Sequence, residues 1–484
     1  MSTYYNPRKS RRRKSNKLRL IVIIEIVVLL SLSGAYYLVA NNRKSNKEDN
    51  KSNSQDVKPD DSSTKDKPIV DDKPVITLTP EEQETIKEQN RIQQEIEERN
   101  VLVAEADKLL LSYDYDGAIE IVMGYKGKEG GYEVYPALDE AIKGYEATKE
   151  SLVKYGGSYT SITQFNHIFF HSLVADNSKA FDGDYEEEGY NMYMTTVSEF
   201  KKIMEIMYAD GYVLISMHDM VKLVPNEEGV LEYEPADIML PQGKKPFVLS
   251  QDDVNYYNYM DGDGFASRIV IGDDGKPTTE MLLEDGSYVR GSFDIVPILD
   301  EFVEAHPDFS YKGAKGVLAL TGYEGALGYR TDDPTSPTYE QDKETVKAVA
   351  QALKDNGWEF ACHGWGHRHS YQISYEAFKK DTLRWMDEVA PLIGPTDYFI
   401  FPYGEDIETT MGHYKSDKFK LLKENGFNYF CGVDKAPWMH LKWDYIRMTR
   451  RPLDGQAMIQ FPERLVDLFD PEVVKDPDRP ARSW

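Results

Sequence analysis

The sequence predicts an α/β fold, a distorted (β/α) barrel, preceded by a transmembrane helix and a small all-α region. From about residue 159, short apolar runs of strand character alternate with helical segments, which indicates a parallel sheet. Roughly 320 residues of this kind suit one barrel. In addition, several polar motifs directly follow the apolar runs, where the active sites of such barrels lie.

Residues 1–19 form a basic tail, and residues 20–40 are nearly all apolar and long enough to span a bilayer. Basic residues before a span place the N-terminus in the cytoplasm. We therefore expect a single-pass anchor in the cell membrane with the remaining chain extracellular. Cleavage as a signal peptide is the alternative. Residues 41–78 are rich in Lys, Asp, Ser and Asn, which is typical of a disordered linker.

Residues 79–157 predict a helical stalk or hairpin. Thr79 can cap a helix, Pro80 suits its first position and Glu82 completes a capping box. A docking unit resembling a tetratricopeptide pair is the alternative to a plain stalk. The domain that carries the chemistry then runs over residues 158–484.

The composition excludes some classes of protein. The net charge of −26 over 484 residues argues against nucleic acid as a partner, because phosphate binding needs a basic face. Two cysteines, Cys362 and Cys431, exclude a disulfide-dense scaffold. We expect two buried thiols, with a disulfide or a thiolate ligand as the alternative.

The expected barrel elements follow one another along residues 158–484. Helices are expected between the strands, and an inserted hairpin is expected at 269–283 with its turn at Asp274-Gly275. The expected strands are 168–170, 212–216, 247–250, 316–320, 358–361 and 398–401, and the expected helices are 197–208, 293–305, 344–356, 375–389 and 418–425.

The candidate site residues follow four of these strands. Two histidines and one carboxylate at strand ends are what a catalytic zinc site needs, with a fourth position left for water. Glycines between the histidines favour a tight loop that aims both rings at one point. The motifs are His171, Asp252-Asp253, His363-Gly364-Trp365-Gly366-His367 and Pro402-Tyr403-Gly404.

These motifs resemble those of the polysaccharide deacetylases, carbohydrate esterase family four. Gln251-Asp252-Asp253, the His363–His367 segment and Phe401-Pro402-Tyr403-Gly404 look like its first three motifs. Phe169-Phe170-His171-Ser172-Leu173 looks like the histidine motif that normally ends the domain, but here it comes first. That order is similar to the circularly permuted poly-N-acetylglucosamine deacetylases.

The resemblance implies a role for each residue. Asp253, His363 and His367 would bind zinc or another divalent first-row metal, and Asp252 would be the general base that activates water. His171 would protonate the leaving amine or stabilise the tetrahedral intermediate. The backbone N–H of Tyr403 would help to hold the oxyanion. Two tryptophans are candidates for lining a sugar subsite, with packing as the equal alternative: Trp365 and Trp438.

The sequence departs from the family pattern in three places. Gln251 and Val254 replace an aromatic residue and a glycine around the Asp pair, and Ile400-Phe401 stands where many members place an arginine that pairs with the base. Arg450 or Arg451 is the candidate to replace that arginine.

The resemblance implies a metal-dependent deacetylase that removes N-acetyl groups from a cell-envelope polysaccharide, and the expected anchor at 20–40 makes it a membrane-anchored extracellular enzyme. Peptidoglycan and a poly-N-acetylglucosamine-like polymer both fit. Two alternatives stay open: an O-acetyl esterase on the same fold, and a non-catalytic module that binds glycan or acts as a scaffold. The altered surroundings of Asp252 motivate the second alternative.

Overall fold

The structure is a computed structural model, and it describes residues 78–156, 165–410, 413–434 and 437–481. Residues from Pro80 onward form one compact unit. The basic tail and the anchor expected at 20–40 lie outside the described residues, as does nearly all of the linker. Among the helices that are described, none has both the length and the apolar character of a membrane span.

The expected helical region is present. Its three helices pack around small and branched apolar residues such as Ala106, Val122 and Leu138, all of which are buried. Asp114 begins the second helix by accepting a hydrogen bond from the backbone N–H of Gly117 at 3.1 Å. The elements are α2 Pro80–Leu111, α3 Tyr115–Met123 and α4 Pro136–Glu150, with a short antiparallel pair β1 Lys126–Gly127 and β2 Gly130–Gly131.

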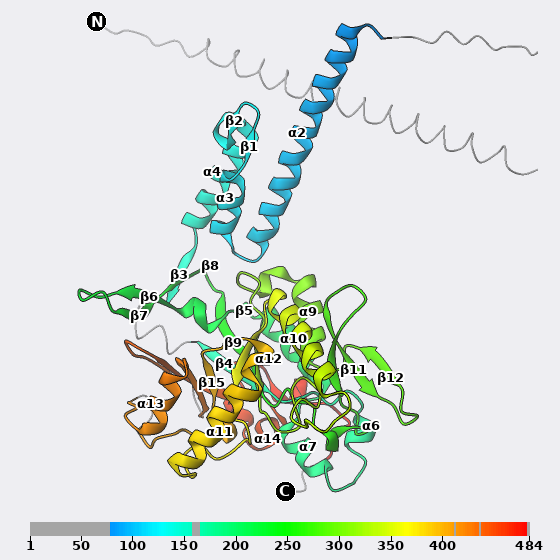
Figure 1. Ribbon diagram of the computed structural model, residues 1–484, viewed down its shortest axis with the longest axis vertical. Helices are drawn as coiled ribbons and strands as arrows, with labels where there is room; N and C mark the ends of the chain where they lie inside the picture. The colour runs from blue at the N-terminus through cyan, green and yellow to red at the C-terminus, as the bar shows by residue number, and fades with distance from the viewer. Residues whose placement is uncertain (1–77, 157–164, 411–412, 435–436, 482–484) are drawn as a thin grey trace, which may run out of the picture. The chain divides into compact units, whose positions relative to one another are not determined.

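The barrel is confirmed. Within the described residues, seven parallel strands pair side by side, and pairing of β13 with β9 closes the ring. Figure 1 labels three of these strands, β4, β9 and β15. A further strand, β5 Tyr212–Leu214, pairs with the beginning of β9. The ring consists of β4 Asn166–Phe170, β9 Lys245–Gln251, β13 Val317–Leu320, β14 Glu359–Cys362, β15 Tyr398–Ile400, β16 Tyr429–Val433 and β18 Ile446–Pro452.

The barrel is distorted, as expected, because several of its strand pairs are short. Only Cys362 and Phe399 pair between β14 and β15, and only two residue pairs join β13 to β9. By contrast, β16 and β18 pair over five residues. The first barrel strand in the chain, β4, lies between β9 and the last barrel strand, β18.

Side chains alternate between the inside of the barrel and its helical coat. Val317, Ala361, Ile400 and Met448 belong to one buried cluster inside the ring. Strand neighbours such as Leu318, Cys362 and Phe399 belong to a second cluster, in which the strands pack against the helices. Cys431 lies in the first cluster and Cys362 in the second, and both are free buried thiols, as expected.

The helices begin at polar caps and bury one apolar face. Thr196 and Glu199 form a capping box at α8, and Ser374 caps α11. Four of the five expected helices start and end within two residues of the expected bounds, and the remaining one, expected at 344–356, begins five residues earlier. The bounds are α8 Val197–Ala209, α9 Ile295–Ala305, α10 Tyr339–Asp355, α11 Tyr375–Glu388 and α13 Asp417–Glu424, with short helices α6 Asn177–Ala180, α7 Glu187–Tyr193, α12 Ala390–Ile393, α14 Gly455–Gln460 and α15 Pro471–Val474.

The expected hairpin insertion is a three-stranded antiparallel sheet. The buried carboxylate of Glu280 joins its strands, because it accepts from Arg268 at 2.7 Å and from Arg290 at 2.9 Å. The strands are β10 Arg268–Ile271, β11 Pro277–Leu282 and β12 Tyr288–Gly291. Smaller antiparallel pairings involve β3 Val153–Gly156 with β8 Asp237–Leu240, β6 Val221–Pro225 with β7 Leu231–Pro235, and β17 Met439–Leu441 with β18.

Candidate active site

The sequence motifs meet at the carboxyl-terminal end of the barrel. Asp252 and Asp253 follow β9, His363 follows β14, and His171 follows β4. The 3₁₀ turn η5 Pro402–Gly404 follows β15. Parallel strands end at one rim, so motifs far apart in the sequence converge there.

The three predicted metal ligands form one group. Candidate ligand atoms of Asp253, His363 and His367 all lie within 4.8 Å of one another. His367 Nε2 lies 3.9 Å from Asp253 Oδ2. Two imidazoles and one carboxylate around one point form the donor set of an open zinc site.

The protonation of these ligands suits a cation. His363 Nδ1 donates to the carbonyl oxygen of Ile400 at 2.8 Å, which leaves its Nε2 with a lone pair. Burial lowers the pKa of His367 to about 4, although the charge of Asp253 opposes this, so the ring is neutral near pH 7. Tyr257 donates to Asp253 Oδ1 at 2.8 Å and orients the carboxylate. The residues present therefore fit a divalent first-row metal.

The backbone is strained at the same positions. Asp253, His367 and Tyr403 have φ values of 57°, 44° and 58°, in a region that residues with a side chain rarely adopt. The carboxylate of Asp381 holds the histidine loop by accepting from the backbone N–H groups of Trp365 at 2.8 Å and Gly366 at 2.9 Å. The loop is thereby fixed with both rings on one side.

Asp252 lies beside the metal-ligand group and is held by Arg450. The guanidinium donates from Nη1 at 2.6 Å and from Nη2 at 2.9 Å, and both side chains are buried. Burial raises the pKa of Asp252, but the guanidinium of Arg450 outweighs this effect and brings the pKa well below its ordinary value. Asp252 is therefore an ionised base 3.8 Å from His363 Nε2. Arg450, on β18, supplies the arginine that the third motif lacks.

A second contact of Arg450 continues the chain of hydrogen bonds inside the barrel. Its Nη1 also donates to Ser250 Oγ at 3.2 Å, and Ser250 Oγ contacts His167 Nε2 at 3.0 Å. Burial lowers the pKa of His167 well below its ordinary value, and Arg450 adds to this, so the ring stays neutral. Ser250 and His167 thus help to fix the arginine that fixes Asp252.

His171 stands at the edge of the same group. Its Nδ1 lies 3.1 Å from the carbonyl oxygen of Tyr193, which can only accept, so Nδ1 carries a hydrogen. The charge of His171 lowers the pKa of both Asp252 and His367, so His171 lies within electrostatic range of each. His171 itself is partly exposed.

Two buried acids near His171 had no assigned role in the sequence. Asp294 accepts from the backbone N–H of Leu173 at 3.0 Å and from Gln251 Nε2 at 2.8 Å, so it joins the loops of His171 and Asp252. Asp454 caps α14, and burial raises its pKa to about 6 while the charge of His171 lowers it. Neither Asp294 nor Asp454 belongs to a motif, so the sequence offered no reason to place them at the site.

The three predicted substrate-binding residues lie in different surroundings. Tyr403 is exposed, and its ring stacks on His369 at 4.0 Å. Trp365 contacts other residues of the protein on several sides. Its Nε1 donates to Glu388 at 2.7 Å, and the guanidinium of Arg384 lies 3.3 Å from its ring centre. The backbone of Gly322 packs against the indole. Packing is therefore the role of Trp365.

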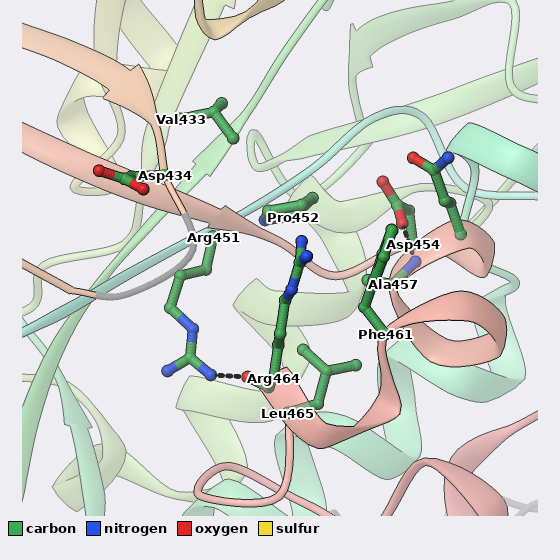
Figure 2. Close-up of a pocket in the computed structure, with 10 residues that line it drawn as sticks. Val433, Asp434, Arg451, Pro452, Asp454, Ala457, Phe461, Arg464 and Leu465 are labelled. Atoms are coloured by element: carbon green, nitrogen blue, oxygen red, sulfur yellow. Dashed lines mark hydrogen bonds between the residues drawn. The ribbon is translucent and has the colours of Figure 1, made fainter.

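Trp438 donates to Asp434 Oδ2 at 2.8 Å, and the guanidinium of Arg447 lies 4.9 Å from its ring. Asp434 lines a cavity of about 330 Å³ beyond the ends of β16 and β18 (Figure 2). The cavity also contains Asp454, the neighbour of His171, and the side chain of Arg464. Trp438 thus contacts the wall of a cavity beside the site, outside the metal-ligand group.

One segment of the chain matches a known protein family. Residues 332–430 match the family model described as polysaccharide deacetylase. The matched segment contains His363, His367 and Tyr403, and the acidic and arginine partners come from other barrel strands. No curated protein matches the chain. The matched segment is about a fifth of the chain, and over this segment the chain is similar to the polysaccharide deacetylase family.

Several solved structures are similar in arrangement. A Streptococcus pyogenes deacetylase, PplD, in complex with acetate has 13% identity and a TM-score of 0.35, with 66% of this chain and 99% of that one covered. A de-N-acetylase from Aggregatibacter actinomycetemcomitans has 12% identity and a TM-score of 0.34, with 63% and 99% covered. A polysaccharide deacetylase from Bacillus cereus has 11% identity and a TM-score of 0.34, with 67% and 70% covered.

Proposed function

We propose that this protein is a metal-dependent deacetylase that removes N-acetyl groups from a cell-envelope polysaccharide. The observation that carries the proposal is the ionised Asp252, clamped by Arg450, beside the ligand group of Asp253, His363 and His367. A base with a lone pair and a cation site at one point are the requirements for activating water towards an amide.

Each residue then has one task. Asp253, His363 and His367 would hold the cation. Zinc in this position supplies a lowered pKa for water and polarisation of the acetyl carbonyl. Asp252 accepts the proton of the attacking water, and its pairing with Arg450 keeps it ionised and oriented. His171 donates a proton to the departing nitrogen, which must leave as an amine.

The η5 turn supports the oxyanion role of Tyr403. The left-handed backbone at Tyr403 turns its N–H out of the regular strand direction at the rim where the other motifs end. A backbone N–H is an effective donor for an oxygen that becomes negative during the reaction. Arg450 pairs with Asp252 in place of the missing arginine, which favours turnover over the non-catalytic alternative.

The proposed location is the outer face of the cell membrane. Residues 1–19 are basic and residues 20–40 are apolar over a length that spans a bilayer, which supports a single-pass anchor with the barrel outside. A cell-envelope polymer is within reach of an enzyme held there. Hydrolysis of one acetamide creates an amine that is cationic near neutral pH, so each turnover changes the charge of the polymer.

The test is acetate release from N-acetylglucosamine oligomers by the full chain, with and without a chelator. Matched O-acetylated oligomers serve to separate amide from ester hydrolysis. We expect release from the amide, loss with the chelator and recovery on adding zinc. Asp252→Asn should lower kcat by about 10² to 10⁴ and leave zinc binding intact. Acetate release that survives both metal removal and His363→Ala contradicts the mechanism.

A further inference from the structure

A row of stacked tyrosines leads away from the metal-ligand group. Tyr257, which donates to Asp253, stacks on Tyr323 with ring centres 4.8 Å apart and on Tyr259 at 5.9 Å. Tyr259 in turn stacks on Tyr190 at 6.5 Å, with the two rings 8° from parallel. The row runs from a buried ring beside the site to an exposed one, since Tyr257 is buried and Tyr259 is 54% exposed.

An open cavity of about 470 Å³ lies at the outer end of this row. It is bounded by helix α7 and the segment before it, and its walls include Tyr185, Tyr193 and Tyr259, with Tyr190 behind them. Tyr190 is fixed in place by donating to Asp263 at 2.8 Å and by packing against Phe265. The cavity therefore has a rigid aromatic back and exposed aromatic rims.

Side chains and backbone link the cavity wall to the active site in two places, through Tyr257, which stacks on the wall residue Tyr259, and through the wall residue Tyr193. Tyr257 contacts Asp253, and the carbonyl oxygen of Tyr193 lies 3.1 Å from His171 Nδ1. One wall residue therefore contacts the proposed proton donor, and the aromatic row contacts a proposed metal ligand. A polymer whose reacting unit lies between Asp253 and His171 would place a neighbouring unit over this cavity.

The charge around the cavity is negative. The segment from Asp182 to Glu188 contains five acidic residues and no basic one. Two of them, Glu186 and Glu188, line the cavity, and neither has an ion-pair partner in the described ranges. The nearest basic residue in the chain before this segment, Lys179, pairs with Glu284 at 3.2 Å. Aromatic faces together with unpaired carboxylates form the surroundings that a cation on a ring-shaped ligand prefers.

We infer that this cavity, called the tyrosine subsite (Tyr185, Glu186, Glu188, Tyr193 and Tyr259), binds an amino-sugar unit whose amine is free and protonated. The sugar ring would stack on exposed tyrosine, and the ammonium group would lie near the two carboxylates. The inference rests on the proposed function, because its ligand is a unit that has already been deacetylated. The enzyme then binds partly deacetylated polymer more tightly than fully acetylated polymer.

The first test measures binding by calorimetry at low salt, with a glucosamine hexamer and an N-acetylglucosamine hexamer as the two ligands and the full chain as the protein. We expect the glucosamine hexamer to bind more tightly. Tyr259→Ala should weaken its binding about threefold to tenfold, since an exposed cation–aromatic contact is modest. Tyr288→Ala removes an exposed tyrosine from β12, far along the chain, and should leave the affinity unchanged.

The second test separates charge from stacking. Glu188→Gln should reduce the preference for the glucosamine hexamer over the acetylated one, and added salt should do the same in the unsubstituted protein. Thermal unfolding confirms that each variant is folded. The inference is overturned if both hexamers bind equally, if the glucosamine hexamer does not bind, or if Tyr259→Ala and Glu188→Gln bind it as the unsubstituted protein does.

Acetate release is measured on the same proteins. The unsubstituted protein could bind the glucosamine hexamer, and lose this binding in Tyr259→Ala, yet release no acetate. That result would contradict the proposed function and support the tyrosine subsite. Acetate release with hexamer binding unaffected by Tyr259→Ala would contradict the subsite alone. In the expected case, Tyr259→Ala raises KM for a partly deacetylated oligomer more than for a fully acetylated one.

Discussion

Arg450 holds Asp252 through two parallel hydrogen bonds, of 2.6 and 2.9 Å, between residues 198 positions apart in the chain. A bidentate pair of this kind fixes both the position and the ionisation of the carboxylate. The arginine comes from the last barrel strand and the aspartate from the end of β9, so closure of the barrel completes the site.

Replacing Arg450 should therefore move the pH dependence of activity. Arg450 keeps the pKa of Asp252 below its ordinary value, so in Arg450→Met that pKa rises and the base becomes protonated at a higher pH. We expect kcat/KM to fall about 100-fold or more at neutral pH, and its acidic limb to shift upward. The measurement is the pH profile of acetate release, and an unmoved acidic limb would contradict it.

The neighbouring arginine provides the control. Arg451 lies on the same strand but pairs with Asp467 at 2.7 Å, away from the metal-ligand group. Arg451→Met should lower stability and leave the acidic limb in place. Breaking the buried pair of Arg450 and Asp252 costs about 3–5 kcal/mol, and loss of the Arg451 pair should cost less because Asp467 is half exposed. Urea unfolding of both variants is therefore needed to separate loss of fold from loss of function.

The hydroxyl of Tyr257 should contribute to metal affinity. It donates to Asp253 at 2.8 Å and orients one ligand. Partners of this kind change metal affinity by about 10- to 100-fold, so Tyr257→Phe should weaken zinc binding by about that amount. Calorimetric titration of metal-stripped protein provides the measurement. Tyr259→Phe, in another ring stacked on Tyr257, is the matched control and should bind zinc normally.

The barrel strands and the grouping of the motifs could be predicted, because parallel strands bring their ends to one rim whatever their separation in sequence. Strand β18 could not be predicted. It contains Arg447, Arg450 and Arg451, which give it the appearance of a surface segment, yet all three are buried. Each is neutralised by an acid elsewhere in the chain, and no local pattern reveals such a pairing.

Trp365 illustrates the opposite case. A tryptophan between two proposed metal-binding histidines is a reasonable candidate for stacking on a sugar. However, Arg384, Glu388 and Gly322 already contact its indole. Those contacts come from α11 and from the loop after β13, so they depend on the tertiary packing alone. The tyrosine row was missed for a related reason, because Tyr190, Tyr257 and Tyr323 become neighbours only in the folded chain.

Asp294 should be important for stability as well as for the site. Its buried carboxylate accepts from Leu173 N–H, Gln251 Nε2 and the hydroxyl of Tyr256, the last at 2.7 Å. Asp294→Ala leaves these donors unsatisfied, and we expect the free energy of unfolding to fall by about 3 kcal/mol or more. Asp294→Asn keeps one acceptor oxygen and should lose less. Equal losses in urea unfolding would contradict this account.

The stability of the barrel should fall in alkaline solution because of His218. Burial lowers the pKa of His218, but contacts with Asp397 at 3.1 Å and Glu359 at 2.6 Å outweigh it and raise the pKa to about 10. Because the pKa of His218 is higher in the folded state than in the unfolded chain, protonation of His218 stabilises the fold. This contribution is complete at pH values below the unfolded pKa, near 6.5. That contribution is lost progressively as the pH rises from about 6.5 to about 10. The free energy of unfolding, measured in urea at pH 6, 8 and 10, should therefore fall more steeply in the unsubstituted protein than in His218→Gln.

His369, at 3.6 Å from Glu405, has a looser ion pair, and His369→Gln should retain the full pH dependence. Identical slopes for His218→Gln and the unsubstituted protein would show that this cluster does not set the alkaline limit.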